Sequence, residues 1–437
     1  MPGSYLISPR RYGGGTAGAC SLLLCLALLA PSPAGARSAK IAAAVARVSP
    51  IRIAEEVRAL AALSRDATEP GFQSATDLVR ARLEQTGLTV RLDPFDLGGK
   101  GQVSNVVAVA PGVGGSRPVL IVSAHYDSIC RPGPGPAPGA EDNASGTAAL
   151  LEIARVLAGE KLATEVWLVA FAGEEHGLWG SRHLAALPGL ASAAQSVINM
   201  DMVGYRPGDR PTEALLDGYP TGRSLEGRLA WAAQIYAALP CSAGLFSEGH
   251  SDHRPFADLG IPSITVASAW WRRYPHYHTS QDLPDQVDAT MVAAVARAVA
   301  AHVLLAAGFA DGPPVAVAGD FVEAEVDREV ELSGAASFDP RGQPLSLEWR
   351  RLDGPAVAIE ASGETLRFTP AEPGVYRFLL HARAADGRVG EPALAAVIVR
   401  DEGGCAVTGK RRIPETALCA LLLLLALRRR IRSLHSD

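Results

Sequence analysis

Between residues 50 and 308 the chain alternates short, almost wholly apolar runs with longer segments of helical periodicity. The runs have the length of strands and lie at residues 105–110, 119–124, 166–172, 197–203 and 264–267. Strands that are apolar on both faces are typical of parallel sheets covered by helices on each side. Helices are predicted at residues 52–63, 74–84, 145–158, 223–238 and 286–307. This pattern predicts an α/β domain with a mostly parallel central sheet flanked by helices.

Composition excludes several broad classes of protein. The 437 residues are 48% hydrophobic and 20% charged, which supplies a sizeable core and excludes a disordered chain. The formal net charge is -5, and the central region has no cluster of lysine and arginine of the kind that binds phosphates. We therefore expect two folded domains and no nucleic-acid partner.

A second domain is predicted after a breaker-rich stretch at residues 308–314. From residue 315 to 401 short alternating runs are separated by turn signals such as Asp386-Gly387, which suits an immunoglobulin-like β-sandwich. The Ser-Phe-Asp-Pro and Leu-Glu-Trp segments resemble those of PKD-like domains. We assign residues 37–309 to the α/β domain, 310–314 to the linker and 315–401 to a PKD-like sandwich, in which the sequence indicates neither chemistry nor a partner.

The amino-terminal segment has the parts of a secretory signal peptide in their usual order. Arg10 and Arg11 precede an apolar stretch at residues 17–30, and two prolines and Ala34-Gly35-Ala36 follow it. We expect cleavage after Ala36, which makes residues 1–36 the signal peptide and predicts export.

The carboxyl-terminal segment, residues 402–437, reads as an anchor or sorting tail. Gly404-Cys405 is followed by an apolar run at residues 417–427 and by an arginine cluster. This arrangement resembles the sorting tails called MYXO-CTERM, and a plain tail anchor is the alternative. Because positive residues stay on the cytoplasmic side, the body of the chain is expected outside the membrane, held at the cell surface or outer envelope, or released.

Cysteine is too sparse for a disulfide-built scaffold. Four of the six cysteines lie in or beside the terminal segments, which leaves Cys130 and Cys241 in the body of the chain. These two could pair after export, but the sequence does not show whether their Cβ atoms come within bonding reach.

Side chains with metal-binding chemistry lie at the ends of the apolar runs. His125 closes one run, Glu174 and Glu175 follow another, and Asp201 lies inside a third. Because ligands bind at the carboxyl ends of strands in an open α/β sheet, these groups are expected to converge. An unpaired buried carboxylate is costly, and few lysines or arginines lie along these segments. Convergent acids without basic partners indicate a metal.

Two further residues complete a set of two histidines and three carboxylates. Asp142 opens a predicted helix, where an isolated aspartate would be read as an N-cap, and His278 lies on the loop before the last helix. Strand periodicity places Asp127 on the same side as His125, where a carboxylate can orient a metal-bound imidazole. Nitrogen and oxygen donors without thiolates suit Zn²⁺, with Mn²⁺ or Co²⁺ as alternatives, and the set suffices for two metals sharing a carboxylate.

Over residues 45–308 the sequence resembles the dinuclear zinc aminopeptidases of metallopeptidase family 28. The matching motifs are His125-x-Asp127, Asp142-Asn143-Ala144-Ser145-Gly146, Glu174-Glu175-x-Gly177, Asn199-Met200-Asp201-Met202-x-Gly204, Ser251-Asp252-His253 and Tyr277-His278-Thr279. The resemblance implies a zinc-exopeptidase fold and two Zn²⁺ per chain. One zinc would be held by His125, Asp142 and Asp201, and the other by Asp142, Glu175 and His278. It further implies that Glu174 is the general base, that Asp127 supports His125 and that a cis peptide bond follows Asp142.

The function implied is that of an exported aminopeptidase acting on peptides. The alternatives are a glutaminyl cyclase-like enzyme, a dipeptidase or carboxypeptidase relative, and an inactive surface binding protein on the same fold. The intact Asp142-to-Gly146 segment favours the two-metal peptidases over the one-metal cyclases. Ser251-Asp252-His253 is expected to shape the substrate pocket, because three consecutive residues rarely satisfy triad geometry. Trp270, Trp271 and Tyr274 either line a pocket or pack beneath the last ligand loop.

Overall fold

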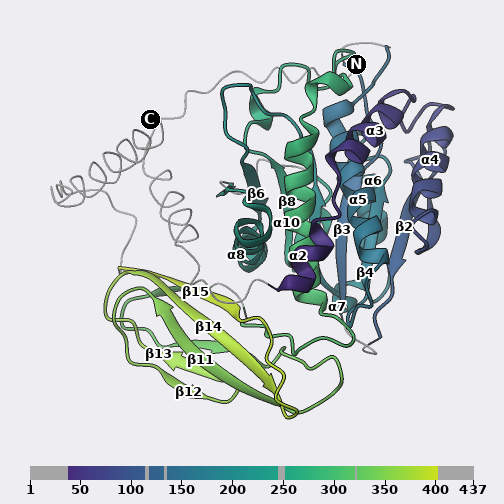
Figure 1. Cartoon of the computed structure of the whole chain (residues 1–437). Helices are drawn as coiled ribbons and strands as arrows, with labels where there is room; N and C mark the ends of the chain where they lie inside the picture. The colour runs from purple at the N-terminus through teal and green to yellow at the C-terminus, as the bar shows by residue number, and fades with distance from the viewer. Residues whose placement is uncertain (1–37, 114–117, 132–134, 245–250, 320–321, 402–437) are drawn as a thin grey trace, which may run out of the picture.

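The computed structural model describes residues 38–113, 118–131, 135–244, 251–319 and 322–401. An α/β unit is followed by an all-β unit, so the predicted fold class is confirmed (Figure 1). The predicted signal peptide and sorting tail lie outside the described residues, and cleavage and anchoring stay predictions.

The α/β unit is built on an eight-stranded sheet of order β1-β2-β4-β3-β5-β8-β6-β7. Its strands are β1 Thr89–Asp96, β2 Gln102–Ala110, β3 Val119–His125, β4 Val166–Phe171, β5 Ala194–Met200, β6 Ala214–Gly218, β7 Cys241–Ala243 and β8 Ser263–Ser268. The central strands β4, β3, β5 and β8 are parallel, while β2 and β6 pair antiparallel with their inner neighbours. Strands β1, β6 and β7 were not predicted from the sequence, because β1 is an exposed edge strand and the other two are short.

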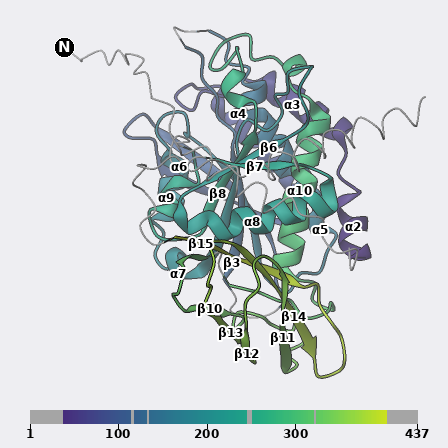
Figure 2. The same cartoon turned by 90° about the vertical axis from the view of Figure 1, so that its left-hand side faces the viewer.

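Helices cover both faces of this sheet, and Figure 2 shows α5 and α10 on the side opposite α6 and α9. The helical segments are α2 Ala39–Val45, α3 Pro50–Ala61, α4 Phe72–Glu84, η1 Ala140–Ser145, α5 Gly146–Ala158, α6 Trp179–Ala185, α7 Leu190–Ala193, η2 Pro220–Gly222, α8 Arg223–Ala232, η3 Ala233–Ala237, α9 Arg254–Ala257, η4 Trp271–Arg273, η5 Pro284–Gln286 and α10 Ala289–Ala307. Strand β3 shows why the sheet needs a layer of helices on each face. Leu120 and Val122 pack into the larger core, whereas Val119 and Ile121 pack into the smaller core on the other face.

Helix α10 is long and apolar enough to cross a membrane, and it is the one such helix in the described ranges. It is instead the central core helix, since 67% of its most apolar window is buried. It packs against α3, α5 and α8. Asp288 caps its first turn by accepting from the backbone N–H groups of Thr290 and Met291.

The β unit is a sandwich of two sheets, β10-β13-β12 and β11-β14-β15-β9. Its strands are β9 Val322–Glu325, β10 Val330–Ser333, β11 Leu345–Asp353, β12 Glu360–Ser362, β13 Thr365–Phe368, β14 Gly374–Ala384 and β15 Ala393–Arg400. Trp349, Phe368, Tyr376 and Phe378 pack between the sheets, as alternation along strands requires. The architecture is that of the expected sandwich, and its PKD-like identity stays a prediction.

The sandwich packs near α7 and α8, at the amino ends of the parallel strands (Figure 1). Polar contacts hold this seam. Arg228 Nη1 donates to Gly319 O at 3.1 Å, and Lys40 pairs with Asp311 at 3.1 Å. The carboxyl ends of the parallel strands, where the predicted metal ligands lie, face away from the seam.

Helix α8 carries a buried acid that makes stability depend on pH. Burial, opposed by Arg223 and reinforced by Asp217, raises the pKa of Glu226 to about 8. The folded state therefore holds a proton that the unfolded state releases above its ordinary pKa, so stability falls as pH rises from about 4.5 toward 8. We expect Glu226→Gln to raise the free energy of unfolding at pH 7, by at most about 3 kcal/mol, and to have little effect near pH 4.

Urea unfolding of the wild type and variant at several pH values measures this difference. The exposed Glu360→Gln serves as the matched control. Parallel stability–pH curves for the wild type and Glu226→Gln would contradict the prediction.

Candidate metal centre

The parallel strands deliver the predicted ligands to one edge of the sheet. His125 is the last residue of β3, Asp201 directly follows β5, and Glu174 and Glu175 lie just beyond β4. Strand β5 begins and ends three residues earlier than the expected run, so it ends at Met200 and leaves Asp201 just beyond the strand rather than within it. Asp142 comes from η1, and His278 from the loop between η4 and η5.

Asp142 faces a histidine with each of its two carboxylate oxygens. Its Oδ1 lies 3.4 Å from His125 Nε2, and its Oδ2 lies 3.1 Å from His278 Nε2. On the first side, His125 Nε2 is also 3.4 Å from Asp201 Oδ1. On the other side, His278 Nε2 is 2.9 Å from Glu175 Oε2. The structure thus brings all five predicted ligands together, with Asp142 in the middle.

These separations suit donors gathered around metal ions. Ligands about 2.0–2.1 Å from a tetrahedral zinc lie roughly 3.3 Å from one another. Two overlapping groups have ligand atoms within 4.8 Å of one another, namely His125 with Glu174 and Asp201, and His125 with Asp142 and Glu175. Glu174, expected as a base, therefore also lies within the donor cluster. Glu175 Oε1 is buried and has no hydrogen-bond partner within the described chain.

The charges of the cluster suit bound cations. Burial and the neighbouring Asp142 raise the pKa of Glu175 to about 8. Burial likewise raises the pKa of Glu174, although His125 opposes the shift. Against the opposing effect of burial, contacts with Asp142 and Glu175 raise the pKa of His278 to about 9. Bound metal ions would supply positive charge that favours the ionised carboxylates and the neutral histidines.

Asp127 supports the centre in a way that the sequence only partly indicated. Its backbone oxygen lies 3.2 Å from His125 Nδ1 and its Oδ1 lies 3.6 Å from the same nitrogen, so Asp127 faces the imidazole that it was predicted to support. It also accepts from the backbone N–H groups of Glu174 at 3.2 Å and Glu175 at 3.1 Å. One buried carboxylate therefore fixes the loop after β4 against the end of β3.

The loop carrying Asp142 is held by residues that sequence reasoning missed. Asp282 accepts from the backbone N–H groups of Glu141 at 2.8 Å and Asp142 at 3.0 Å. The buried Glu141 accepts in turn from Gly204 and Tyr205, which ties this loop to the one after Asp201. The peptide bond after Asp142 is cis, as the resemblance implies. Asp282 follows His278 by four residues, so spacing alone gave no signal of its role.

Ser251 orients another ligand. It donates to Asp201 Oδ2 at 2.6 Å and accepts from Asn199 Nδ2 at 2.8 Å. Its hydroxyl is therefore engaged with a predicted ligand, which argues against a serine nucleophile. Tyr274 is buried and donates to Asp282 at 2.5 Å, so it packs beneath the ligand loop. Tyr277 is 48% exposed and its ring stacks on that of His278.

Arg65 is fully buried below the centre and was also missed. Its guanidinium donates to four backbone carbonyls, those of Leu60, Tyr126, Pro138 and Gly139, at 2.6–2.9 Å. These bonds join helix α3, the end of β3 and the loop that leads to Asp142. Burial lowers the pKa of Arg65 to about 10, so it stays charged at neutral pH.

We expect Arg65→Met to lower the free energy of unfolding by at least about 3 kcal/mol, because buried carbonyls lose their donors. The exposed Arg80, which pairs with Glu84, supplies the control, and Arg80→Met should cost less than about 1 kcal/mol. Denaturant unfolding of the two metal-free variants gives both numbers. Equal losses would show that the buried guanidinium does not hold this loop.

Comparisons with known proteins agree with this geometry. Residues 105–303 match the sequence model of peptidase family M28. A probable zinc metalloprotease of Pyrenophora teres f. teres is 37% identical over 162 residues, 36% of this chain and 31% of the relative. Aminopeptidase YwaD of Bacillus subtilis is 34% identical over 177 residues, 38% of this chain and 36% of the relative. The chain thus spans about a third of the length of these two relatives.

Solved structures share the fold of the α/β unit. The Legionella pneumophila LapA aminopeptidase superposes with a TM-score of 0.56 at 23% identity, covering 64% of this chain and 79% of the other. A Bacteroides thetaiotaomicron glutaminyl cyclase gives 0.51 at 20% identity, covering 58% and 97%. At these identities the likeness concerns the fold alone. The segment from residue 105 to 303, which contains the whole candidate metal centre, is therefore similar in sequence to peptidase family M28 and has the fold of solved aminopeptidases.

Proposed function

We propose that this chain is an exported zinc aminopeptidase that hydrolyses the N-terminal peptide bond of peptides with two zinc ions. The position of Asp142 carries the proposal. Its two oxygens face two histidines, and each histidine lies against a further carboxylate, Asp201 on one side and Glu175 on the other. The match to peptidase family M28 and the zinc metalloprotease and aminopeptidase relatives support the same conclusion.

The residues present fit two zinc sites that share a carboxylate. His125, Asp142 and Asp201 would hold one ion, and Asp142, Glu175 and His278 the other. When bound, such a pair activates water near neutral pH and polarises the scissile carbonyl. Glu174 accepts the proton of the attacking water and delivers it to the departing amine. Asp127 and Ser251 hold the ligands in place during these steps.

Acidic residues also explain a preference for free amino termini. The carboxylates Glu174, Glu175 and Asp201 lie at one edge of the sheet, and no lysine or arginine in the described ranges forms an ion pair with them. A substrate's free α-amine could approach the ions and the nearby carboxylates, whereas an interior peptide bond offers no such group. Export follows from the predicted signal peptide, and attachment to a membrane or cell surface from the predicted carboxyl-terminal tail.

A glutaminyl cyclase is the second candidate, since a solved cyclase shares the fold. His278 lies against both Asp142 and Glu175, and these three residues supply donors for a second ion, which favours the two-metal peptidase.

Metal analysis combined with two substrates tests the proposal. We expect about two zinc ions per chain, release of the free amine from aminoacyl anilides, loss of that activity with a chelator and recovery with Zn²⁺. A glutaminyl peptide should not be cyclised. One zinc per chain together with cyclisation would assign the rival activity, and fully metal-loaded protein that cleaves no unblocked substrate would overturn the peptidase assignment.

A further inference from the structure

Two consecutive residues between helices α3 and α4, Arg65 and Asp66, contact two different loops of the candidate metal centre. Arg65 holds the first of these loops. Its guanidinium donates to Pro138 O at 2.6 Å and to Gly139 O at 2.7 Å, on the stretch of chain that leads directly to Asp142. The position of the Asp142 loop is therefore tied to the segment between α3 and α4.

Asp66 contacts the second loop, which carries Glu174 and Glu175. Its Oδ1 lies 2.8 Å from Nε2 of His176, the residue directly after Glu175, and the two side chains are only 24% and 15% exposed. Against the opposing effect of burial, hydrogen bonds from His176 and Thr68 lower the pKa of Asp66 to about 2. An ionised carboxylate can only accept, so Nε2 of His176 is the donor.

The two loops have to stand at a fixed separation, because Glu175 and Asp142 face the same nitrogen. His278 Nε2 lies 2.9 Å from Glu175 Oε2 and 3.1 Å from Asp142 Oδ2. A metal site works only when its ligands are held within about 0.5 Å of the required geometry. Asp127 fixes the Glu175 loop against the end of β3, and Asp66 fixes it to the same segment that holds the Asp142 loop.

We propose that Asp66 is a positioning residue, which through His176 holds Glu175 at the separation from Asp142 that a shared metal ion requires. This inference rests on the proposed function, in which Glu175 belongs to one zinc site and Asp201 to the other. The effect of Asp66 is therefore selective. Loss of its contact with His176 weakens zinc binding at the site of Glu175 and leaves the site of Asp201 unchanged.

Zinc titration of the full metal-free protein tests this selectivity. We expect Asp66→Ala to weaken one of the two zinc ions about tenfold, at the lower end of the range for residues outside the ligand set, and to leave the other ion unchanged. His176→Ala should have the same effect, and the double variant no larger one, because the two residues form a single contact. In the metal-loaded variants kcat should fall with little change in KM, since the same loop carries Glu174.

Two single-site backgrounds identify the affected ion. Glu175→Ala removes a ligand of one site, and Asp201→Ala removes a ligand of the other. Adding Asp66→Ala should weaken the ion that remains in the Asp201→Ala chain and should not affect the ion that remains in the Glu175→Ala chain. The reverse pattern, or equal weakening in both backgrounds, would overturn the proposal.

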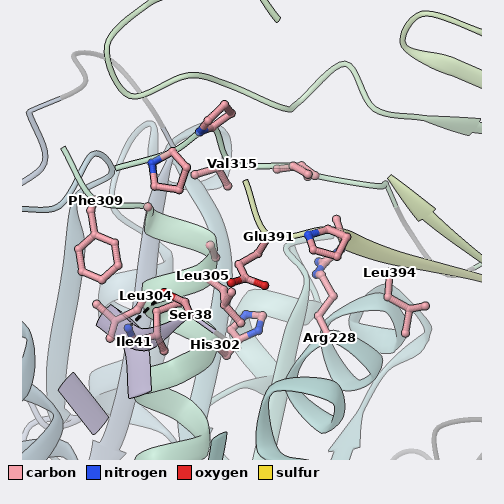
Figure 3. Close-up of a pocket in the computed structure, with 18 of the residues that line it drawn as sticks. Ser38, Ile41, Arg228, His302, Leu304, Leu305, Phe309, Val315, Glu391 and Leu394 are labelled. Atoms are coloured by element: carbon pink, nitrogen blue, oxygen red, sulfur yellow. Dashed lines mark hydrogen bonds between the residues drawn. The ribbon is translucent and has the colours of Figure 1, made fainter. Parts of the chain in front are cut away.

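Two control variants separate positioning from stability. Asp77→Ala removes an exposed hydrogen bond with Gln73 on α4 and should change the affinity of neither zinc ion. Val315→Ala removes packing from a pocket of about 150 Å³ in the seam with the sandwich, away from the candidate metal centre (Figure 3). It should lower the melting temperature in chelator and leave zinc affinity unchanged. If Asp66→Ala did the same, its role would be structural and the proposal would be wrong.

The zinc titration also distinguishes failure of this inference from failure of the proposed function. A wild type that binds fewer than two zinc ions would reject the proposed function, and the inference with it. A wild type that binds two ions whose affinities do not change in Asp66→Ala would reject the inference alone.

Discussion

Glu174→Gln is expected to lower kcat for aminoacyl substrates by about 10²–10⁴-fold, the usual contribution of a general acid–base group, with zinc content unchanged. Glutamine has nearly the same shape but cannot accept the proton of the attacking water. The backbone of Glu174 is fixed by Asp127, so the substitution should leave the loop after β4 in place.

Zinc content makes this experiment decisive, because the Glu174 carboxylate lies within 4.8 Å of the donor atoms of His125 and Asp201. If Glu174 is a base that does not bind metal, Glu174→Gln should lose turnover and keep its metal ions. If Glu174 is a ligand, the variant should lose metal as well. Unchanged turnover would reject both roles. Glu84→Gln, on the exposed face of α4, is the control for handling and purity.

Asp142→Asn should abolish the shared site. An amide presents one oxygen instead of two, so it cannot face His125 and His278 with equivalent donors. We expect fewer than two zinc ions per chain and a loss of activity larger than the roughly 10–100-fold that substitutions outside the ligand set cost.

Zinc titration of the metal-free protein, with kinetics on the same samples, measures both effects. Asp77→Asn, at an exposed position of α4, is the matched control. Thermal unfolding of the variant in chelator shows whether it folds. Two tightly bound zinc ions in Asp142→Asn would contradict a bridging role.

Much of the fold was predictable because the burial of a segment is reflected in its own pattern of apolar and polar residues. The central strands are apolar on both faces, and that pattern indicated parallel strands under two layers of helices. The outer strand β1 gave a weak signal in the sequence, because only some of its residues are buried and it contains Pro94. The sequence also suggested that Asp201 lay within a strand, whereas β5 ends one residue earlier.

The candidate ligands were predictable for a related reason. A carboxylate at the end of a buried strand costs free energy unless it meets a cation. The candidate metal ligands could therefore be identified from their positions in the sequence. The residues that hold them could not be read in this way. Arg65, Glu141 and Asp282 act through backbone groups far away in the sequence, and no spacing rule connects them with His125 or Asp142.

By itself the sequence determined the layered α/β class, the separate β unit and the types of residue that meet at the strand ends. Hydrophobic periodicity and the free-energy cost of burying a charge are both evident within a short segment of chain. Only the tertiary structure decided which oxygen of Asp142 faces which histidine, which backbone groups fix the loops, and that Asp66 lies against His176. Such contacts join segments far apart in the chain, and chain packing alone sets their distances.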